Sequence, residues 1–514
     1  MSVQQILLVS ERPIWRDALG IALQSAGIVH DGAGSDESLG KAQSFEPTSV
    51  VIDTDEGPFG GSYERVARTM RSLRDANREL PIVLITEIPR DDFSDLAIGF
   101  GRARVLLPEH LANPVKLADE VLTAIATCPS AEAPDQAAWA TVEITVRPAS
   151  VCCDVRVDGA IRFIGPRSFP SRAHLLILND EWKYYESSDE VFRSKVGLHE
   201  MRTAGEHLRV ALQGALNMAR DFCPRKLAQD GLIYYRFGLP DGDFEFVPFE
   251  AVTTDNPNEY LRDVHPFARR LVSREEHSDP DWEPDGEPRK RVLLIVSKAD
   301  GLLSVPSYTF KNRENLALRS LAHLDAERDG IRKLYAENQI EVLELTSRDD
   351  NITRIEQAFK ASRFDVVHFA GHSTRAYGPG ETGKVFLALP APPDSRVVVP
   401  YSAENLARLA SEGQTRLVIL SSCESSSGQT LSHMAARGVP AVAGFRWPVD
   451  DEDASVFTVE LHRQLQLEGG RVAVTAAFHK ALLSLKSRTE GRLTGFSPIL
   501  LLQRSVWHDF QAEA

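Results

Sequence analysis

The stretch "VVHFAGH" at residues 366–372 decides the fold of the C-terminal half of this chain. Its first five residues are apolar apart from His368, a pattern typical of a strand that is buried on both faces of a parallel sheet. Ligands and reacting groups lie just beyond the carboxyl ends of such strands. His372 stands at that position, so the sequence predicts a functional histidine at the edge of a sheet.

A second apolar run, "RLVILSSCESS" at residues 416–426, ends in the same way with Cys423. A thiolate is a nucleophile, and a nearby imidazole lowers the pKa of the thiol or takes its proton. Taken singly, a strand-end histidine and a buried cysteine are more often structural. Together, at the ends of neighbouring parallel strands, His372 and Cys423 indicate a Cys-His catalytic pair.

Length and composition set the limits of what the chain can be. Its 514 residues suggest about three domains, from a prior of roughly 100–200 residues each. A formal charge of −15 argues against nucleic acid as a partner. No apolar run is long enough to span a bilayer and the N-terminus lacks a basic signal segment, so we expect no membrane partner and a cytoplasmic location. The five cysteines show no zinc or disulfide spacing.

The N-terminal region, residues 1–128, alternates five apolar strands with helices, which predicts a doubly wound parallel sheet. It resembles a response-regulator receiver domain with a flavodoxin-like sheet, and Asp53 ends the third strand where that family carries its phosphate acceptor. Thr86 also fits the family pattern. However, Ser10-Glu11 replaces the usual acidic pair, and "LLPEHL" stands where receivers carry a lysine. Phosphoryl transfer needs Mg²⁺ and a cation, so a pseudo-receiver is favoured.

The middle region, residues 138–204, follows a linker at 129–137. Short alternating strands around a Val-Asp-Gly turn predict a small antiparallel sheet here. A helix is expected over about 203–222, and then "GLIYYRFGLPDGDFEFVPFEAV" at 231–252 predicts strand, turn and strand. The acidic, proline-rich segment at 273–289 is typical of an exposed linker.

From Arg291 onward, strands and helices alternate again over a length sufficient for a complete doubly wound domain. The segments "HFAGHS", "LVILSSCES", "GVPAVAGFRWPVDDEDA" and "GDFEFVPFEAV" resemble the CHAT family of caspase-like cysteine proteases, which is related to caspases and separase. The resemblance covers residues 205–508. It implies a caspase-like doubly wound sheet, so the whole chain is expected to be an α/β protein with a small α+β middle region.

The resemblance assigns roles to individual residues. It implies that Cys423 is the nucleophile and His372 the general acid and base, and that the backbone N–H groups of Ser373 and Cys423 hold the oxyanion. Asp450 and Asp451 lie where this fold builds part of the pocket for the substrate residue before the cut. Their carboxylates fit a basic side chain there, or equally the start of the following helix.

Two other motifs point away from cofactors. "GPGETGKV" at 378–385 nearly spells a phosphate-binding loop, but Val385 replaces the Mg²⁺-binding hydroxyl and a strand follows where a helix is required. His368 and His372 lie on a strand, about 13 Å apart, which is too far for joint zinc chelation. We therefore expect neither a metal nor an organic cofactor.

The favoured function is a regulated cysteine endopeptidase that cleaves a specific protein target, which by resemblance belongs to bacterial signalling or defence. The N-terminal domain is expected to bind a regulatory protein partner or to form a homodimer. Two alternatives stay open. One is a catalytically inactive caspase-fold interaction scaffold, and the other is a phosphorelay receiver-effector protein that depends on Asp53.

Overall fold

The computed structural model describes residues 4–502 apart from a set of short gaps. These gaps are 55–62, 78–79, 87–102, 107–112, 127–139, 148–149, 158–159, 165–171, 188–190, 192–194, 223–232, 241–245, 255, 273–290, 311–313, 348–349, 379–383, 423–433, 435–437, 448, 468–473 and 490–491. The linkers expected at 129–137 and 273–289 therefore lie outside the described residues. The chain forms two compact units, and the second contains Ile144–Val151, Phe169–Gln213 and Tyr234–Ala514.

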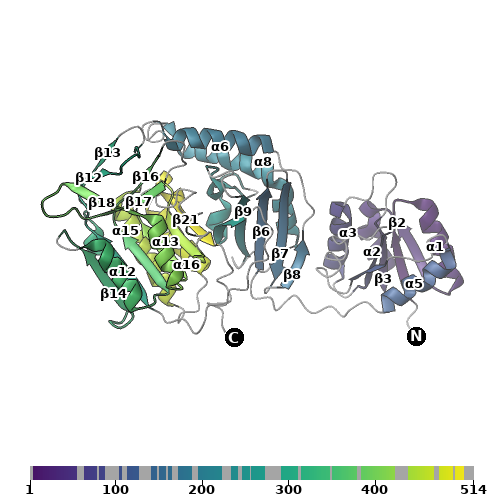
Figure 1. Cartoon of the computed structure of the whole chain (residues 1–514). Helices are drawn as coiled ribbons and strands as arrows, with labels where there is room; N and C mark the ends of the chain where they lie inside the picture. Colours follow the sequence, from purple (N-terminus) through teal and green to yellow (C-terminus); the bar gives the residue numbers. More distant parts are fainter. Residues whose placement is uncertain are drawn as a thin grey trace. The chain divides into compact units, whose positions relative to one another are not determined.

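The first unit contains a five-stranded parallel sheet with the order β2-β1-β3-β4-β5 (Figure 1). The strands are β1 (Gln5–Val9), β2 (Val29–Ala33), β3 (Ser49–Asp53), β4 (Ile82–Ile85) and β5 (Ala103–Leu106). The central strands form continuous apolar runs and are buried, as sheets covered on both faces require. This flavodoxin-like order confirms the predicted doubly wound sheet.

Helices cover this sheet. They are α1 (Pro13–Ser25), α2 (Ser38–Phe45), α3 (Tyr63–Ala76) and α5 (Pro114–Ala126), with the 3₁₀ turn η1 (Ser35–Glu37). Leu19 and Leu23 of α1 pack with Leu117 and Val121 of α5 against the strands. Their spacing of three or four residues places them on one face of each helix, which is why these segments fold as amphipathic helices.

Three strands of the middle region follow: β6 (Ala140–Arg147), β7 (Ser150–Val157) and β8 (Ala160–Ile164). β7 and β8 pair antiparallel, which confirms the predicted hairpin, whereas residues 158–159 of the expected Val-Asp-Gly turn lie outside the described residues. The helices α6 (Arg172–Ser187) and α8 (Leu198–Phe222) come next. We did not predict α6, although Leu175, Leu178 and Trp182 recur at helical spacing and are buried on one face.

The main sheet of the second unit contains the order β14-β11-β15-β19-β20-β21-β10-β9. These strands are β9 (Ile233–Pro240), β10 (Phe267–Val272), β11 (Val292–Ser297), β14 (Ile340–Leu345), β15 (Val366–Ala370), β19 (Leu417–Ser421), β20 (Ala441–Phe445) and β21 (Pro498–Leu502). All neighbours from β14 to β20 are parallel, whereas β21 runs antiparallel to β20. The α/β architecture and the last strand expected at "FSPILLLQ" are therefore confirmed.

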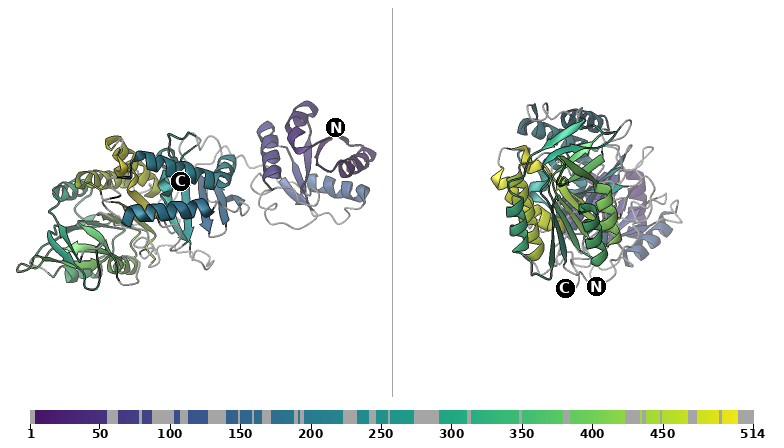
Figure 2. Two further views of the ribbon diagram at one scale, coloured as in Figure 1. Left: turned by 90° about the horizontal axis from the view of Figure 1, so that it is seen from above. Right: turned by 60° about the vertical axis from the view of Figure 1, so that its left-hand side comes forward.

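Helices flank both faces of this sheet, as the right-hand view of Figure 2 shows. On one face lie α12 (Asn351–Ala361) and α13 (Ala403–Glu412), which pack on β15 and β19. On the other face lie α11 (Leu324–Arg332) and α15 (Asp451–Leu467), with α16 (Val474–Arg488) against β10 and β21. Short helical turns complete the unit: α10 (Leu261–Val264) and η5 (Leu493–Phe496). Within the described ranges, no helix has the length and apolarity needed to cross a bilayer.

A second sheet was not predicted. Its order is β13-β12-β18-β17-β16, and its strands are β12 (Gly301–Ser304), β13 (Asn315–Leu318), β16 (Ser373–Ala376), β17 (Lys384–Leu389) and β18 (Val397–Ser402). Three of these strands have only four residues, too few for an alternating pattern to stand out. β16 begins directly after His372, so this sheet borders the edge where the catalytic residues were predicted.

The prediction of a second strand around "VPFE" was wrong. Residues Phe249–Ala251 form the 3₁₀ turn η4. Pro248 has no N–H to donate to a sheet, and the buried carboxylate of Glu250 binds the Arg269 guanidinium through both oxygens. In this turn the Glu250 side chain is buried in the core.

Candidate active site

The carboxyl ends of β15 and β19 lie side by side in the main sheet. In their parallel register Ala370 is the partner of Ser421, and the Gly371 N–H donates to the Ser421 carbonyl at 3.2 Å. His372 follows Ala370 by two residues, and Cys423 follows Ser421 by two residues. Cys423 itself lies outside the described residues. His372 and Cys423 are therefore each two residues beyond a paired strand end in the sequence.

The ring of His372 is held by a backbone carbonyl. Its Nε2 lies 2.6 Å from the Arg319 carbonyl oxygen, between β13 and α11. Because a carbonyl only accepts hydrogen bonds, Nε2 carries the proton and Nδ1 is the basic nitrogen. We did not predict this contact, since a backbone oxygen leaves no trace in the residue types. A histidine with one nitrogen fixed and the other basic is arranged to exchange protons with a neighbouring thiol.

Burial lowers the pKa of His372, while the hydrogen bond to Arg319 and the negative charge of Asp451 act in the opposite direction. The net effect leaves the imidazole neutral near pH 7, the form that acts as a base. The Asp451 carboxylate is fixed by the His323 N–H, which donates to it at 2.6 Å just before α11. The first residue of α15 thus supplies a negative charge near His372.

Gly371 lets the chain pass closely beside β11. A Cβ at this position would lie 3.0 Å from both the Cβ and the carbonyl oxygen of Ser297. Ser297 is itself fixed, because its hydroxyl donates to the Ala388 carbonyl at 2.6 Å. A side chain before His372 would therefore require Ser297 to shift by a few tenths of an ångström.

Ser373, assigned to the oxyanion hole, is buried at the start of β16 and pairs with Leu387 of β17. A positive φ here would strain a serine. Among the described non-glycine residues, positive φ occurs at Glu46, Ser307 and Gln414 and not at Ser373. Its side chain therefore imposes no backbone strain, and its assignment to the oxyanion hole stays a prediction.

The acidic pair at 450–451 lies at the beginning of α15. The Asp450 carboxylate is exposed and lies 3.4 Å from the Arg492 guanidinium. The backbone carbonyl of Asp450 accepts a hydrogen bond from the Ala454 N–H at the start of the helix. Negative charge is favourable at a helix start, which agrees with the second interpretation from the sequence. The role of Asp450 and Asp451 in a substrate pocket remains a prediction.

His368 belongs to a buried polar chain on the α11 and α15 side of the sheet. Its Nδ1 lies 2.9 Å from His462 Nε2, and His462 Nδ1 lies 2.8 Å from the Tyr335 hydroxyl. Its Nε2 lies 3.1 Å from the Glu327 carboxylate, which also accepts from the Thr458 hydroxyl at 2.6 Å. In the described part of the chain, no group of three His, Cys, Asp or Glu side chains is arranged to hold a metal. His368 therefore connects α11, β15 and α15 around the strand that carries His372.

The carboxylate of Asp53 in the first unit is bound by an arginine side chain. The Arg12 guanidinium binds both carboxylate oxygens, at 2.6 and 2.7 Å, and the Ser10 hydroxyl donates at 2.7 Å. Glu11, the remaining member of the expected acidic pair, instead accepts the Ser35 N–H at 2.7 Å. A bidentate guanidinium is strong and geometrically specific for a carboxylate. It thus binds the oxygens that would coordinate a metal or attack a phosphoryl group.

We predict that acetyl phosphate with Mg²⁺ does not phosphorylate the wild-type chain. The physical reason is that Arg12 and Ser10 bind both oxygens of Asp53. Intact-mass measurement after incubation is expected to show no phosphoryl adduct. Asp53→Asn is the control for acceptors elsewhere. An adduct in the wild type that disappears in Asp53→Asn would contradict this account and favour the phosphorelay alternative.

A family model described as "CHAT domain" matches residues 237–507, more than half of the chain. The chain belongs to the CHAT domain family. The matched range contains His372, Ser373 and Cys423 as well as the acidic residues that begin α15. All of α8 precedes the matched range, and the domain start at residue 205 stays a prediction. No curated protein matches the sequence.

Solved structures similar to this chain align with about a quarter of it. Chemotaxis protein CheY4 of Vibrio cholerae is 19% identical, covers 24% of this chain and 99% of its own, and has a TM-score of 0.21. A response regulator from Thermotoga maritima is 19% identical, covers 24% of this chain and 100% of its own, and has a TM-score of 0.21. The receiver domain of the putative response regulator NarL from Mycobacterium tuberculosis is 16% identical, covers 25% of this chain and 99% of its own, and has a TM-score of 0.20. The evidence for a receiver-like domain before the CHAT domain in the sequence is the sheet order β2-β1-β3-β4-β5.

Proposed function

We propose that this chain is a regulated cysteine endopeptidase that acts through Cys423 and His372 on a specific protein target. The observation that supports the proposal is the parallel register of β15 with β19, because His372 and Cys423 each follow the paired ends of these strands by two residues in the sequence. The CHAT domain is a caspase-like protease family, which supports the same reaction class. The carbonyl of Arg319 adds support, because it orients the histidine.

The reaction follows from the chemistry of these groups. Neutral His372 takes the proton of the Cys423 thiol at Nδ1, and the resulting thiolate attacks the scissile carbonyl. The backbone N–H groups of Ser373 and Cys423 stabilise the oxyanion. Protonated His372 then gives its Nδ1 proton to the leaving amine, and a thioester remains. Water, deprotonated by His372, attacks the thioester and releases the carboxylic acid and the thiol. The balance needs no metal, oxidant or organic cofactor.

Regulation is assigned to the N-terminal part of the chain. An uncontrolled endopeptidase would damage the cell that makes it, so we infer that the receiver-like domain binds a regulatory protein or a second copy of the chain. Because the Arg12 guanidinium is ion-paired with the Asp53 carboxylate, this control is expected to act through protein contacts rather than through phosphorylation. By family resemblance, the setting is bacterial signalling or defence in the cytoplasm.

The experiment that tests the proposal is N-terminal labelling mass spectrometry in the native host under several stresses. Wild type is compared with Cys423→Ala and with His372→Ala. New protein N-termini that require both residues would establish proteolysis, and basic residues before the cuts would support the acidic pocket. Identical N-termini in all three strains under every condition would favour the inactive scaffold.

Replacing Asp451 by asparagine is predicted to change the pH dependence of this proteolysis. The negative charge of Asp451 raises the pKa of His372 against the effect of burial, so its removal lowers that pKa further. The acidic limb of the pH profile of kcat/KM is therefore expected to move to lower pH, because the imidazole stays neutral further into acid. Asp450→Asn is the matched control, and an equal shift in that variant would contradict the role of Asp451.

A further inference from the structure

Helix α6 precedes the matched CHAT domain but packs on a segment of it within the second unit. Trp182, on the inner face of the helix, is 1% exposed and stacks on Trp447, with ring centroids 5.6 Å apart. Trp447 lies two residues after the end of β20, on the way to α15. The helix therefore contacts the chain where it leaves the sheet toward the acidic pair at 450–451.

The Glu186 carboxylate, in the last turn of α6, joins the helix to this segment. Arg446 Nε and Nη2 each lie 2.7 Å from Glu186 Oε1, and Trp447 Nε1 donates to the same oxygen at 2.9 Å. The side chains of Glu186 and Arg446 are 10% and 3% exposed. Hydrogen bonds to a charged acceptor in a buried position are stronger than neutral ones in water. Glu186 thus anchors two successive residues of the segment.

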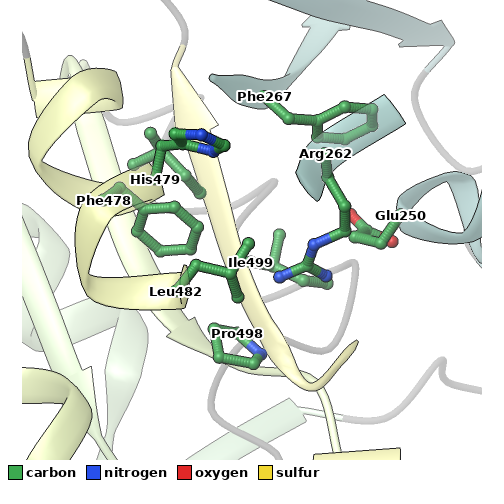
Figure 3. A pocket seen from close by; sticks show the side chains of 9 residues that line it. Glu250, Arg262, Phe267, Phe478, His479, Leu482, Pro498 and Ile499 are labelled. Atoms are coloured by element: carbon green, nitrogen blue, oxygen red, sulfur yellow. The ribbon is translucent and has the colours of Figure 1, made fainter. Parts of the chain in front are cut away.

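A second carboxylate near Arg446 does not replace this anchor. Glu250 lies farther away, 3.9 Å from Arg446 Nη1. Both of its oxygens bind Arg269, and its charge also acts on Arg262, whose side chain lies beside it in Figure 3. Without Glu186, the buried Arg446 guanidinium would therefore lose its closer carboxylate.

The anchored segment ends at Asp451, whose charge acts on His372. Asp451 follows Trp447 by four residues, a chain length of at most about 14 Å. Its carboxylate accepts the His323 N–H at 2.6 Å and raises the pKa of the His372 imidazole against the effect of burial. Because so few residues separate them, a displacement of Trp447 is expected to move Asp451 as well.

The same helix is also connected to the strand that follows His372. The Asn179 side-chain oxygen of α6 accepts the Phe246 N–H at 3.1 Å. The Arg375 guanidinium of β16 lies over the Phe246 ring, 5.7 Å from its centroid. Arg375 is three residues beyond His372. α6 is thus connected to both segments that border the candidate site.

We propose that Glu186 is a positioning residue for the candidate active site: through Arg446 and Trp447 it holds Asp451 beside His372. The inference rests on the proposed function, in which His372 exchanges protons with the nucleophile. Because α6 precedes the matched CHAT domain, the middle region then contributes to the reactivity of a site that lies in another part of the sequence.

The test measures the titration of His372 itself. Deuterium exchange at the imidazole Cε1–H, followed by mass spectrometry, reports the pKa of each ring, and fragmentation of the peptide separates His372 from His368. Because Asp451 raises the pKa of His372, Glu186→Gln is expected to lower it. Glu181→Gln, at an exposed position of the same helix, is the matched control and should leave that pKa unchanged.

Two double variants separate this explanation from simpler ones. Glu186→Gln combined with Asp451→Asn should lower the pKa of His372 no further than Asp451→Asn alone, because both changes act through one carboxylate. Glu186→Gln combined with Arg446→Met removes both charges of the buried pair. It should therefore recover stability in thermal unfolding while the lower pKa of His372 persists. This variant decides the question if Glu186→Gln alone does not fold.

An unchanged pKa of His372 in the folded Glu186 variants would overturn the proposal. So would a shift that adds to that of Asp451→Asn, because Glu186 would then act directly by its charge, or a shift of equal size in Glu181→Gln. The measurement needs neither substrate nor Cys423. The expected shift without any proteolysis would therefore contradict the proposed function and leave the positioning role of Glu186 intact.

Discussion

Replacing His372 by alanine is expected to reduce the rate at which this chain generates new protein N-termini by about 10²–10⁴-fold. The carbonyl of Arg319 fixes Nε2, so Nδ1 is the nitrogen that exchanges protons with the nucleophile and the leaving amine. Alanine removes this nitrogen but leaves the fold largely unchanged, because the ring is only half-buried at the sheet edge. The loss is therefore predicted in turnover and not in stability.

The matched control is His199→Ala, since His199 is exposed on α8 and has no role in the proposed reaction. It is expected to retain the wild-type rate. The measurement is the time course of product N-termini by quantitative mass spectrometry with purified chain and an identified substrate. If His372→Ala cleaves at the wild-type rate, the general acid-base role assigned to this residue is wrong.

Replacing Glu250 by glutamine is expected to lower the free energy of unfolding by about 3–5 kcal/mol. Glu250 is 4% exposed and binds the Arg269 guanidinium through both oxygens. Glutamine leaves Arg269 charged and buried without its carboxylate, and it removes the negative charge that also acts on Arg262 and Arg446. Denaturant unfolding followed by tryptophan fluorescence would measure the loss, since Trp447 stacks with Trp182 beside this cluster.

The pH dependence of this effect has a definite sign. Burial alone would raise the pKa of Glu250, but Arg269 and Arg446 hold it below its usual range. The stabilisation is therefore complete above the unfolded pKa of about 4.3 and is lost as the pH falls through the folded value. The difference between wild type and Glu250→Gln should shrink in acid.

Two variants separate this explanation from a general loss of packing. Glu412→Gln removes a carboxylate from an exposed pair on α13 and is expected to cost less than about 1 kcal/mol. Glu250→Gln combined with Arg269→Met removes both charges and should recover much of the lost stability. A double variant as unstable as the single one would show that the ion pair is not the cause.

The sequence was sufficient to predict the strands that position the candidate site. β15 is apolar apart from His368 and β19 is apolar up to Ser421, so their type, burial and ends could be predicted from residue types alone. The short strands β12, β13 and β16 could not, because four residues carry too little pattern. Pairing with distant segments forms them, and a single sequence does not reveal such pairing.

The sequence did not predict the contacts that residues distant along the chain make with His372 and Asp53. Arg319 lies 53 residues before His372 and contributes a backbone oxygen, which any residue type offers. Arg12 lies 41 residues before Asp53 and was not assigned a role. An arginine directly after the usual position of the acidic pair was the available signal. Its meaning became clear only from the two short contacts with the carboxylate.

The most direct test of the central claim is the alkylation rate of Cys423 as a function of pH. Peptide mapping after brief iodoacetamide treatment would compare all five cysteines in wild type and in His372→Ala. We predict that Cys423 reacts fastest near neutral pH in the wild type and that this advantage disappears in the variant. A Cys423 that reacts no faster than the other cysteines, or whose rate does not depend on His372, would contradict the Cys-His pair.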